Sequence, residues 1–267
     1  MAEPEFVVEG DLVVVKIDGV AQSAINPLDP TQLDFIYTER IADYLDAIDE
    51  PGVRYRVVHI GGAGMMLARY VAATRPTSPQ IVLEPDEELT ELVRLHVPLP
   101  ERSGIKVRPR DGRLGLTQMP DDYARVIIVD AFDGASVPAD LVSTEFFADV
   151  SRVLESDGLL IMNIIDQRPF DWARRVIAGI TEIFGHFAVG TQPTIFNRPM
   201  FGNMIVAGSN APLPIDAVRH ASACAIWPHR ILADFEVLKF VAGAQPFNDA
   251  DAVRSPVAGA TGNLRFT

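Results

Sequence analysis

Short apolar runs alternate with segments of helical periodicity through the middle of the chain. The apolar runs cover residues 55–62, 80–86, 105–112, 124–134 and 158–166. Apolar side chains recur at roughly 3.6-residue spacing in the segments 65–75, 87–97, 144–158 and 171–185. Unbroken apolar strands that alternate with helices are typical of a parallel sheet covered by helices on both faces. The pattern therefore predicts an α/β fold with a mostly parallel sheet.

The two ends of the chain depart from this alternation. Near the N-terminus, two β-branched runs flank residues 9–11, which predicts a hairpin, and helical spacing between residues 30 and 51 predicts an amphipathic helix. Farther along, strand-like runs at 186–193 and 201–209 are joined by a short connection, so we expect an antiparallel edge to the sheet. We predict a small N-terminal β-hairpin element at residues 1–26 and a larger Rossmann-like domain at residues 27–267.

Composition narrows the class of protein. The 267 residues carry a net charge of −13, which argues against nucleic acid as a partner because phosphates require a basic surface. The apolar runs are shorter than the roughly 20 residues of a membrane span, and the acidic N-terminus lacks the features of a secretory signal. A single cysteine, Cys224, excludes an internal disulfide. We therefore expect a cytoplasmic protein that is not bound to a membrane.

The loop after the first central strand is rich in glycine. In an open α/β sheet, ligands bind beyond the carboxyl ends of the strands. Gly61, Gly62 and Gly64 let backbone N–H groups approach a ligand at the start of the following helix. The match to the dinucleotide fingerprint G-x-G-x-x-G is incomplete, because Leu67 replaces its last glycine. We expect these glycines to bind a nucleoside or nucleotide.

Acidic residues follow the next strands. Glu84 lies about 20 residues beyond the glycine loop, the distance at which a carboxylate meets ribose hydroxyls, although it is also placed to cap the helix at 87–97. Asp111 and Gly112 are placed to accept a hydrogen bond from an adenine amine, or to form an ordinary turn.

Asp130 and Asp133 lie where the fourth strand of this region ends. Burying these carboxylates without a charge partner is costly, and a cationic ligand would meet that cost.

Other side chains in this region have ordinary structural interpretations. His59 lies inside an apolar strand, where we expect a core histidine with a hydrogen-bond partner. Met65 and Met66 open a helix, so we expect one of them in the core and the other facing the ligand. The histidines show no metal-ligand spacing with one another, and we predict no metal site.

Several segments, taken in order, resemble the spermidine synthase (polyamine aminopropyltransferase) family. They are "LDFIYTERI", "IGGAGMM", "VLEPD", "RDGR", "YARVIIVDAFDG", "TEFFADVSRVLESDGLL" and "FGNMIVAGS". The resemblance extends over most of the chain. It implies the Rossmann fold of S-adenosylmethionine-dependent methyltransferases, with the small N-terminal β element as an addition and a homodimer as the assembly.

The resemblance implies transfer of an aminopropyl group from decarboxylated S-adenosylmethionine to an amine such as putrescine, without a metal. An alkylammonium with a pKa of about 10.4 has no free lone pair at neutral pH, so the reaction needs a base. By resemblance Asp130 is that base and Asp133 holds the amine. Tyr37 is similar to the tyrosine that lines the amine site, and a helix-face core aromatic is the alternative. Glu84 is then assigned to the ribose, and Asp111 with Gly112 to the adenine.

The glycine loop also departs from the family pattern. Gly64 stands where the family has the aspartate that holds the donor's aminopropyl ammonium, which predicts weaker binding of the decarboxylated donor. Two alternatives follow from this change: an S-adenosylmethionine-dependent methyltransferase, whose donor carries a carboxylate, or a nucleoside-binding protein without efficient turnover. A nicotinamide-dependent dehydrogenase is less favoured, because the last fingerprint glycine is absent.

Overall fold

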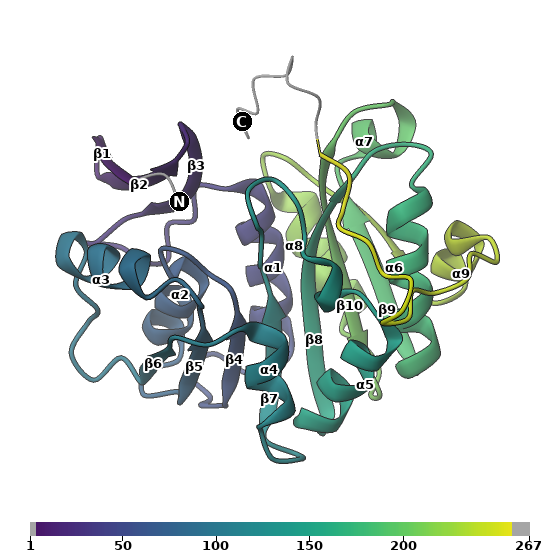
Figure 1. The fold of residues 1–267 in the computed structure, drawn as a ribbon, viewed down its shortest axis with the longest axis horizontal. Helices are drawn as coiled ribbons and strands as arrows, with labels where there is room; N and C mark the ends of the chain where they lie inside the picture. The colour runs from purple at the N-terminus through teal and green to yellow at the C-terminus, as the bar shows by residue number, and fades with distance from the viewer. Residues whose placement is uncertain (1–3, 258–267) are drawn as a thin grey trace.

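The computed structural model describes residues 4–257, and its centre is an eight-stranded sheet (Figure 1). In spatial order the strands are β11 (Arg230–Ala233), β9 (His186–Thr191), β10 (Gly202–Ser209), β8 (Leu154–Asp166), β7 (Ala124–Val129), β4 (Val57–Ile60), β5 (Gln80–Leu83) and β6 (Ile105–Arg108). Strands β8, β7, β4, β5 and β6 run parallel, and β10, β9 and β11 are antiparallel. The predicted fold class is confirmed, and β11 extends the antiparallel edge by a strand that the apolar pattern does not predict.

Helices pack on both faces of this sheet. They are α1 (Ile36–Ala47), α2 (Met66–Thr74), α3 (Glu87–His96), α4 (Gly112–Thr117), α5 (Thr144–Val153), α6 (Asp171–Ile183), α7 (Pro193–Asn197), α8 (Ile215–Cys224) and α9 (Phe235–Val241), with a short 3-10 helix at Ala139–Leu141. Between residues 4 and 257, no helix has the length and apolar character needed to cross a membrane.

Strand β7 shows how the two faces are filled. Its side chains alternate in direction, so Ile127 packs with the α5 and α6 side, whereas Val126 and Ile128 pack with Ile41 and Leu45 of α1. All five side chains are fully buried or nearly so. This two-sided burial is why the sequence is apolar without interruption from Val126 to Val129, directly before Asp130.

The segment at residues 144–158 is only partly the predicted helix. Helix α5 ends at Val153, and β8 begins at the next residue, because Leu154 already pairs with Ala124 of β7. Ser143 begins the helix by accepting a hydrogen bond from the Phe146 N–H at 3.2 Å. Sheet pairing therefore overrides the helical spacing in the last part of the segment.

The N-terminal element is a three-stranded antiparallel sheet rather than a hairpin alone. It consists of β1 (Glu5–Glu9), β2 (Leu12–Ile17) and β3 (Val20–Ile25). Asp18 and Gly19 join β2 to β3 with φ angles of 51° and 75°, a conformation that suits a tight two-residue turn. Among the described residues this sheet pairs with no strand of the large sheet. It lies beyond one end of β4 and β5 (Figure 1).

Candidate active site

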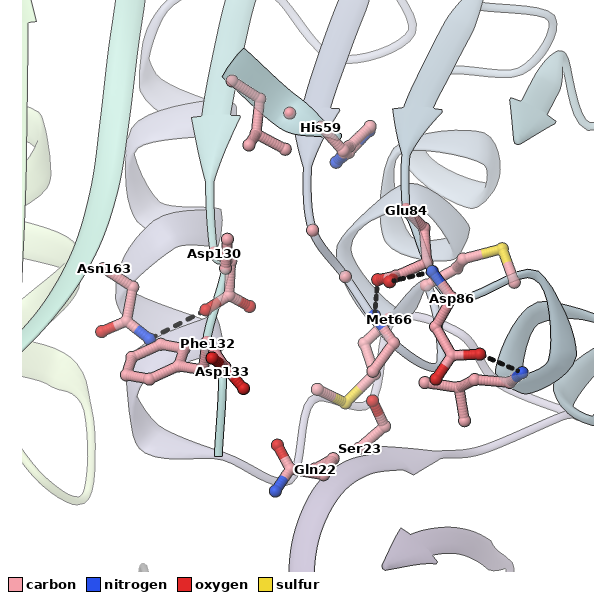
Figure 2. A pocket seen from close by; sticks show the side chains of 18 of the residues that line it. Gln22, Ser23, His59, Met66, Glu84, Asp86, Asp130, Phe132, Asp133 and Asn163 are labelled. Carbon is pink, nitrogen blue, oxygen red and sulfur yellow. Dashed lines mark hydrogen bonds between the residues drawn. The ribbon is translucent and has the colours of Figure 1, made fainter. Parts of the chain in front are cut away.

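A cavity of about 590 Å³ lies between the carboxyl ends of the parallel strands and strand β3. Figure 2 shows Asp130 with Asn163 on one side of it, Glu84 on the other, and Met66 with Ser23 between them. The sequence-predicted residues that line the cavity are Tyr37, Gly61, Gly62, Glu84, Asp111, Gly112, Asp130 and Asp133. Gly64, which was also predicted, is not among the lining residues. The sheet topology thus brings together loops that are far apart in the sequence.

Asp130 is held by two hydrogen bonds at the end of β7. The Asn163 side chain donates to Oδ1 at 2.9 Å, and the Tyr37 hydroxyl donates to Oδ2 at 3.2 Å. Asn163 in turn accepts a hydrogen bond from the Asn203 side chain at 2.9 Å. A carboxylate has about four lone-pair sites, so each oxygen of Asp130 keeps acceptor capacity toward the cavity.

Burial governs the electrostatics of this group. Removal from water raises the pKa of Asp130, and the hydrogen bonds from Asn163 and Tyr37 partly oppose that rise. Burial and the neighbouring carboxylate also raise the pKa of Tyr37 well above its ordinary value, so the phenol stays protonated and donates. The arrangement therefore supplies a fixed carboxylate with a raised affinity for protons.

Glu84 connects β5 to the glycine loop. Its Oε1 accepts from the Asp86 N–H at 3.1 Å, and its Oε2 accepts from the Ala63 N–H at 3.3 Å. Burial raises the pKa of Glu84, and these two backbone hydrogen bonds act in the opposite direction. The helix cap is Asp86 instead, whose Oδ1 accepts from the Leu89 N–H at 2.8 Å. Glu84 is therefore fixed at the cavity wall rather than used to begin α3.

The glycine loop depends on backbone conformation. Gly61 has a φ of 77°, and an added Cβ there would lie 2.6 Å from the carbonyl oxygen of Asp130. Gly64 is buried against β3, where its N–H donates to the Ser23 hydroxyl at 2.9 Å. A Cβ on Gly64 would lie 2.6 Å from the Cβ of Ser23. The loop is thus enclosed by β7 on one side and β3 on the other.

Both methionines of the loop are buried, and both line the cavity. The expected division, with one methionine in the core and the other at the ligand, is therefore not what the structure shows. The thioether of Met66 accepts a hydrogen bond from the Ala24 N–H at 3.1 Å, which ties α2 to β3. These side chains provide an apolar, polarizable surface between the two carboxylate sides.

Asp111 begins helix α4, which was not predicted. Its Oδ1 accepts from the Leu114 N–H at 2.9 Å, and Gly112 follows in close contact with Ile60. The residue thus forms the cap that an Asp-Gly sequence favours, and it still lines the cavity. Its position at the cavity leaves contact with an adenine as a prediction.

The cavity lining is acidic. Its carboxylates are Asp18, Glu84, Asp86, Asp111, Asp130, Asp133 and Asp140, and no lysine or arginine is among the lining residues that the structure describes. Asp133 forms an ion pair at 2.6 Å with Arg254, which lies outside the cavity lining. No group of three or more histidine, cysteine or acidic residues within residues 4–257 has an arrangement that could hold a metal ion. The charge of the site favours cationic ligands.

His59 is a buried core histidine as expected, although it borders the cavity. One ring nitrogen lies 2.8 Å from the side-chain oxygen of Gln80, and burial lowers the pKa of His59 to about 4. The imidazole is therefore neutral near pH 7 and adds no positive charge to the cavity.

Sequence reasoning missed Asn163 and Asn203. Both lie inside strands, whereas the prediction placed ligand-binding residues in the loops that follow the strands. The available signal was a single amide within the apolar run "GLLIMNIID", because a buried amide requires hydrogen-bond partners.

No protein-family model matches the chain. Over 172 residues it is 24% identical to the polyamine aminopropyltransferase of Chromobacterium violaceum, a match that covers 61% of this chain and 62% of that protein. Over 153 residues it is 29% identical to a probable polyamine aminopropyl transferase of Bifidobacterium longum, covering 55% of this chain and 34% of that protein. The chain thus matches less than two thirds of the length of these curated relatives.

Solved structures resemble the chain over more of its length. A probable spermidine synthase from Corynebacterium glutamicum is 29% identical and superposes with a TM-score of 0.86, covering 92% of both chains. The spermidine synthase of Thermotoga maritima (19% identical, TM-score 0.61) covers 92% of this chain and 78% of its own. Human methyltransferase-like protein 13 (17% identical, TM-score 0.57) covers 80% of this chain and 96% of its own. The last two show the shared fold alone. In sequence and in fold, the chain therefore resembles polyamine aminopropyltransferases and spermidine synthases, at low sequence identity to each relative.

Proposed function

We propose that the protein transfers an aminopropyl group from decarboxylated S-adenosylmethionine to an amine such as putrescine. One observation carries this proposal: the cavity is lined by carboxylates, with no lysine or arginine among its described residues. The donor, with its sulfonium and ammonium, and the acceptor amine are all cationic at neutral pH. The similarity to spermidine synthases supports the same reaction.

Asp130 acts as the general base in this proposal. It takes a proton from the acceptor ammonium, and the freed nitrogen attacks the carbon next to the sulfonium. The carbon–sulfur bond then breaks, and the nucleoside leaves as a neutral thioether. The raised pKa of Asp130 favours this role, because a carboxylate with a higher proton affinity is a stronger base. Tyr37 lines the amine site, and Asp133 holds the amine.

The nucleoside occupies the opposite side of the cavity. Glu84 receives the ribose hydroxyls, Asp111 with Gly112 receives the adenine, and Gly61 with Gly62 forms the surface that the backbone presents to the ligand. In this arrangement the donor sulfur lies over the methionine surface, with its aminopropyl arm directed toward Asp130.

An S-adenosylmethionine-dependent methyltransferase is a second candidate, because Gly64 supplies no carboxylate to hold the ammonium of the decarboxylated donor or to repel the carboxylate of S-adenosylmethionine. The support from this position is limited, because Gly64 lies against Ser23 of β3 and outside the cavity lining. Against this candidate stands the absence of a cationic side chain among the described lining residues, because the methionine carboxylate would enter an acidic cavity unpaired. Binding without efficient turnover is the remaining alternative.

The test is a calorimetric titration with decarboxylated S-adenosylmethionine, S-adenosylmethionine and methylthioadenosine, followed by product assays. We expect the decarboxylated donor to bind more tightly than S-adenosylmethionine. We also expect the product assay to find its aminopropyl group on putrescine. Transfer of a methyl group instead supports the second candidate, and tight binding without product supports the third. No binding of any of the three nucleosides at millimolar concentration contradicts the assignment of the cavity.

Homodimer assembly and a cytoplasmic location belong to the same proposal and rest on the resemblance to spermidine synthases. The division into residues 1–26 and 27–267 is also proposed, supported by the lack of strand pairing between the two sheets among the described residues. Light scattering after size-exclusion chromatography tests the dimer, and fractionation of cells tests the location. Limited proteolysis near residue 26 tests the division.

A further inference from the structure

The segment after α9 is tied to the loop that carries Asp133. The Ser255 N–H donates to the Val137 carbonyl at 3.2 Å, and the Val137 N–H donates to the Ser255 hydroxyl at 2.9 Å. One residue before Arg254, the Val253 carbonyl accepts from the Trp172 indole at 2.8 Å. Arg254 lies between these anchored neighbours, so its backbone is held beside the loop.

Asp133 is equally constrained. Its N–H donates to the Ser136 carbonyl at 2.8 Å across a turn in which Gly134 has a φ of 63°. From this turn its carboxylate meets the Arg254 guanidinium at 2.6 Å, and Asp133 also borders the cavity. The carboxylate assigned to hold the acceptor amine is therefore already paired with a cation of the same chain.

We propose that Arg254 is a specificity-determining residue, an internal cation that competes with the acceptor for Asp133. This inference rests on the proposed function and specifies it further: the reacting amine lies at Asp130, and Asp133 holds the second ammonium of the acceptor. A diamine presents a second ammonium, which must displace Arg254 to reach Asp133, whereas a monoamine does not. Arg254 thus lowers the advantage that a diamine would otherwise have over a monoamine.

The expected size of the effect follows from solvent exposure. The side chains of Arg254 and Asp133 are 60% and 63% exposed, so water and salt weaken their attraction. Removing one partner of such a pair changes an affinity by up to about fivefold. The effect should shrink as the salt concentration rises.

The experiment measures kcat/KM for 1,4-diaminobutane and for butylamine and takes their ratio. We expect Arg254→Gln to raise the ratio about threefold to fivefold over wild type, Arg254→Glu to raise it further, and Arg254→Lys to leave it near wild type. In an Asp133→Asn background, Arg254→Gln should leave the ratio unchanged. A ratio that does not rise in Arg254→Gln, or that rises equally without Asp133, overturns the proposal.

A matched control separates charge from anchoring. Asp251 pairs with Arg175 in the same C-terminal segment, so Asp251→Asn loosens the segment and leaves the Arg254 charge in place. An increase in the ratio equal to that of Arg254→Gln would show that anchoring, and not competition, is the cause.

Calorimetric titration of the same variants with 1,4-diaminobutane provides a second readout. If no variant transfers a group to either amine, the proposed function fails. The Arg254 proposal is then decided by binding alone: tighter diamine binding in Arg254→Gln supports it, and unchanged binding overturns it.

Discussion

The two sides of the cavity differ in whether side chains or the backbone form the wall. On the β7 and β8 side, the wall is a network of polar side chains: Asp130 is held by Tyr37 and Asn163, and Asn163 is held by Asn203. On the glycine-loop side, Gly61 and its neighbours form a wall whose shape is set by backbone angles and close packing. The first side determines charge and proton affinity, whereas the second determines shape.

Because of this difference, the two sides of the cavity should tolerate amino-acid substitutions differently. A side-chain network can lose chemistry while the fold survives, because its members project from α1, from the end of β7 and from β8 and β10, which are held in place by other packing contacts. A backbone wall cannot be altered in the same way, because an added Cβ meets the chain that supports it. Substitutions on the two sides should therefore divide into those that reduce rate and those that reduce stability.

The largest expected effect is on the network side. Asp130→Asn removes the base and should lower kcat by about a hundredfold or more. Because burial raises the folded-state pKa of Asp130, the folded protein binds more protons than the unfolded chain between the two pKa values, and stability falls as pH rises through that window. The neutral amide removes this cost, so thermal unfolding at pH 7 should occur at the same temperature or higher. A large fall in the unfolding temperature would contradict the division between substitutions that reduce rate and substitutions that reduce stability.

Gly61→Ala should have the opposite profile and lower the free energy of unfolding by about 2–4 kcal/mol. The cause is a positive φ together with the contact to the Asp130 carbonyl. Gly10→Ala is the control, because Gly10 also has a positive φ of 63° but nothing within 4 Å of an added Cβ. Urea denaturation gives the free energy of unfolding of both variants. It therefore compares backbone strain alone, in Gly10→Ala, with backbone strain plus the contact to the Asp130 carbonyl, in Gly61→Ala. Equal losses would show that the contact costs nothing.

Gly64→Ala should cost about 1–2 kcal/mol through overpacking against Ser23, with no backbone strain. Gly185→Ala is its control, since an added Cβ there meets nothing within 4 Å. If the two variants unfold at the same urea concentration, the packing between α2 and β3 is looser than the contact implies.

The smallest expected effect is a shift in pH dependence. Asn163→Ala removes a hydrogen bond that lowers the pKa of Asp130, so that pKa should rise further. The base must be deprotonated to act, and the acid limb of the kcat/KM profile should therefore move to higher pH. We expect a loss of about tenfold at most, concentrated at low pH. An acid limb that stays in place or moves to lower pH would show that Asp130 does not control the profile.

The sequence predicted the parallel core and the loops after β4, β5, β6 and β7. Burial on both faces leaves β4, β5 and most of β7 largely apolar, and a glycine or an acidic residue follows each of them. It did not predict β3, whose "VAQSAI" lacks an apolar run and owes its strand form to pairing with β2. Asn163 and Arg254 were missed because their roles depend on partners distant in the sequence, which no local pattern records.

The small N-terminal sheet has a thermodynamic consequence. Strand β3 forms a wall of the cavity, yet it is connected to the α2 loop through hydrogen bonds such as those of Ser23 and Ala24, without strand pairing among the described residues. A ligand that fills the cavity touches both sheets and so stabilises their association. By linkage, any change that separates the N-terminal sheet from the large sheet must weaken ligand binding by the same factor by which the ligand stabilises their association. Amide hydrogen exchange in β3 therefore measures how fully the cavity is occupied.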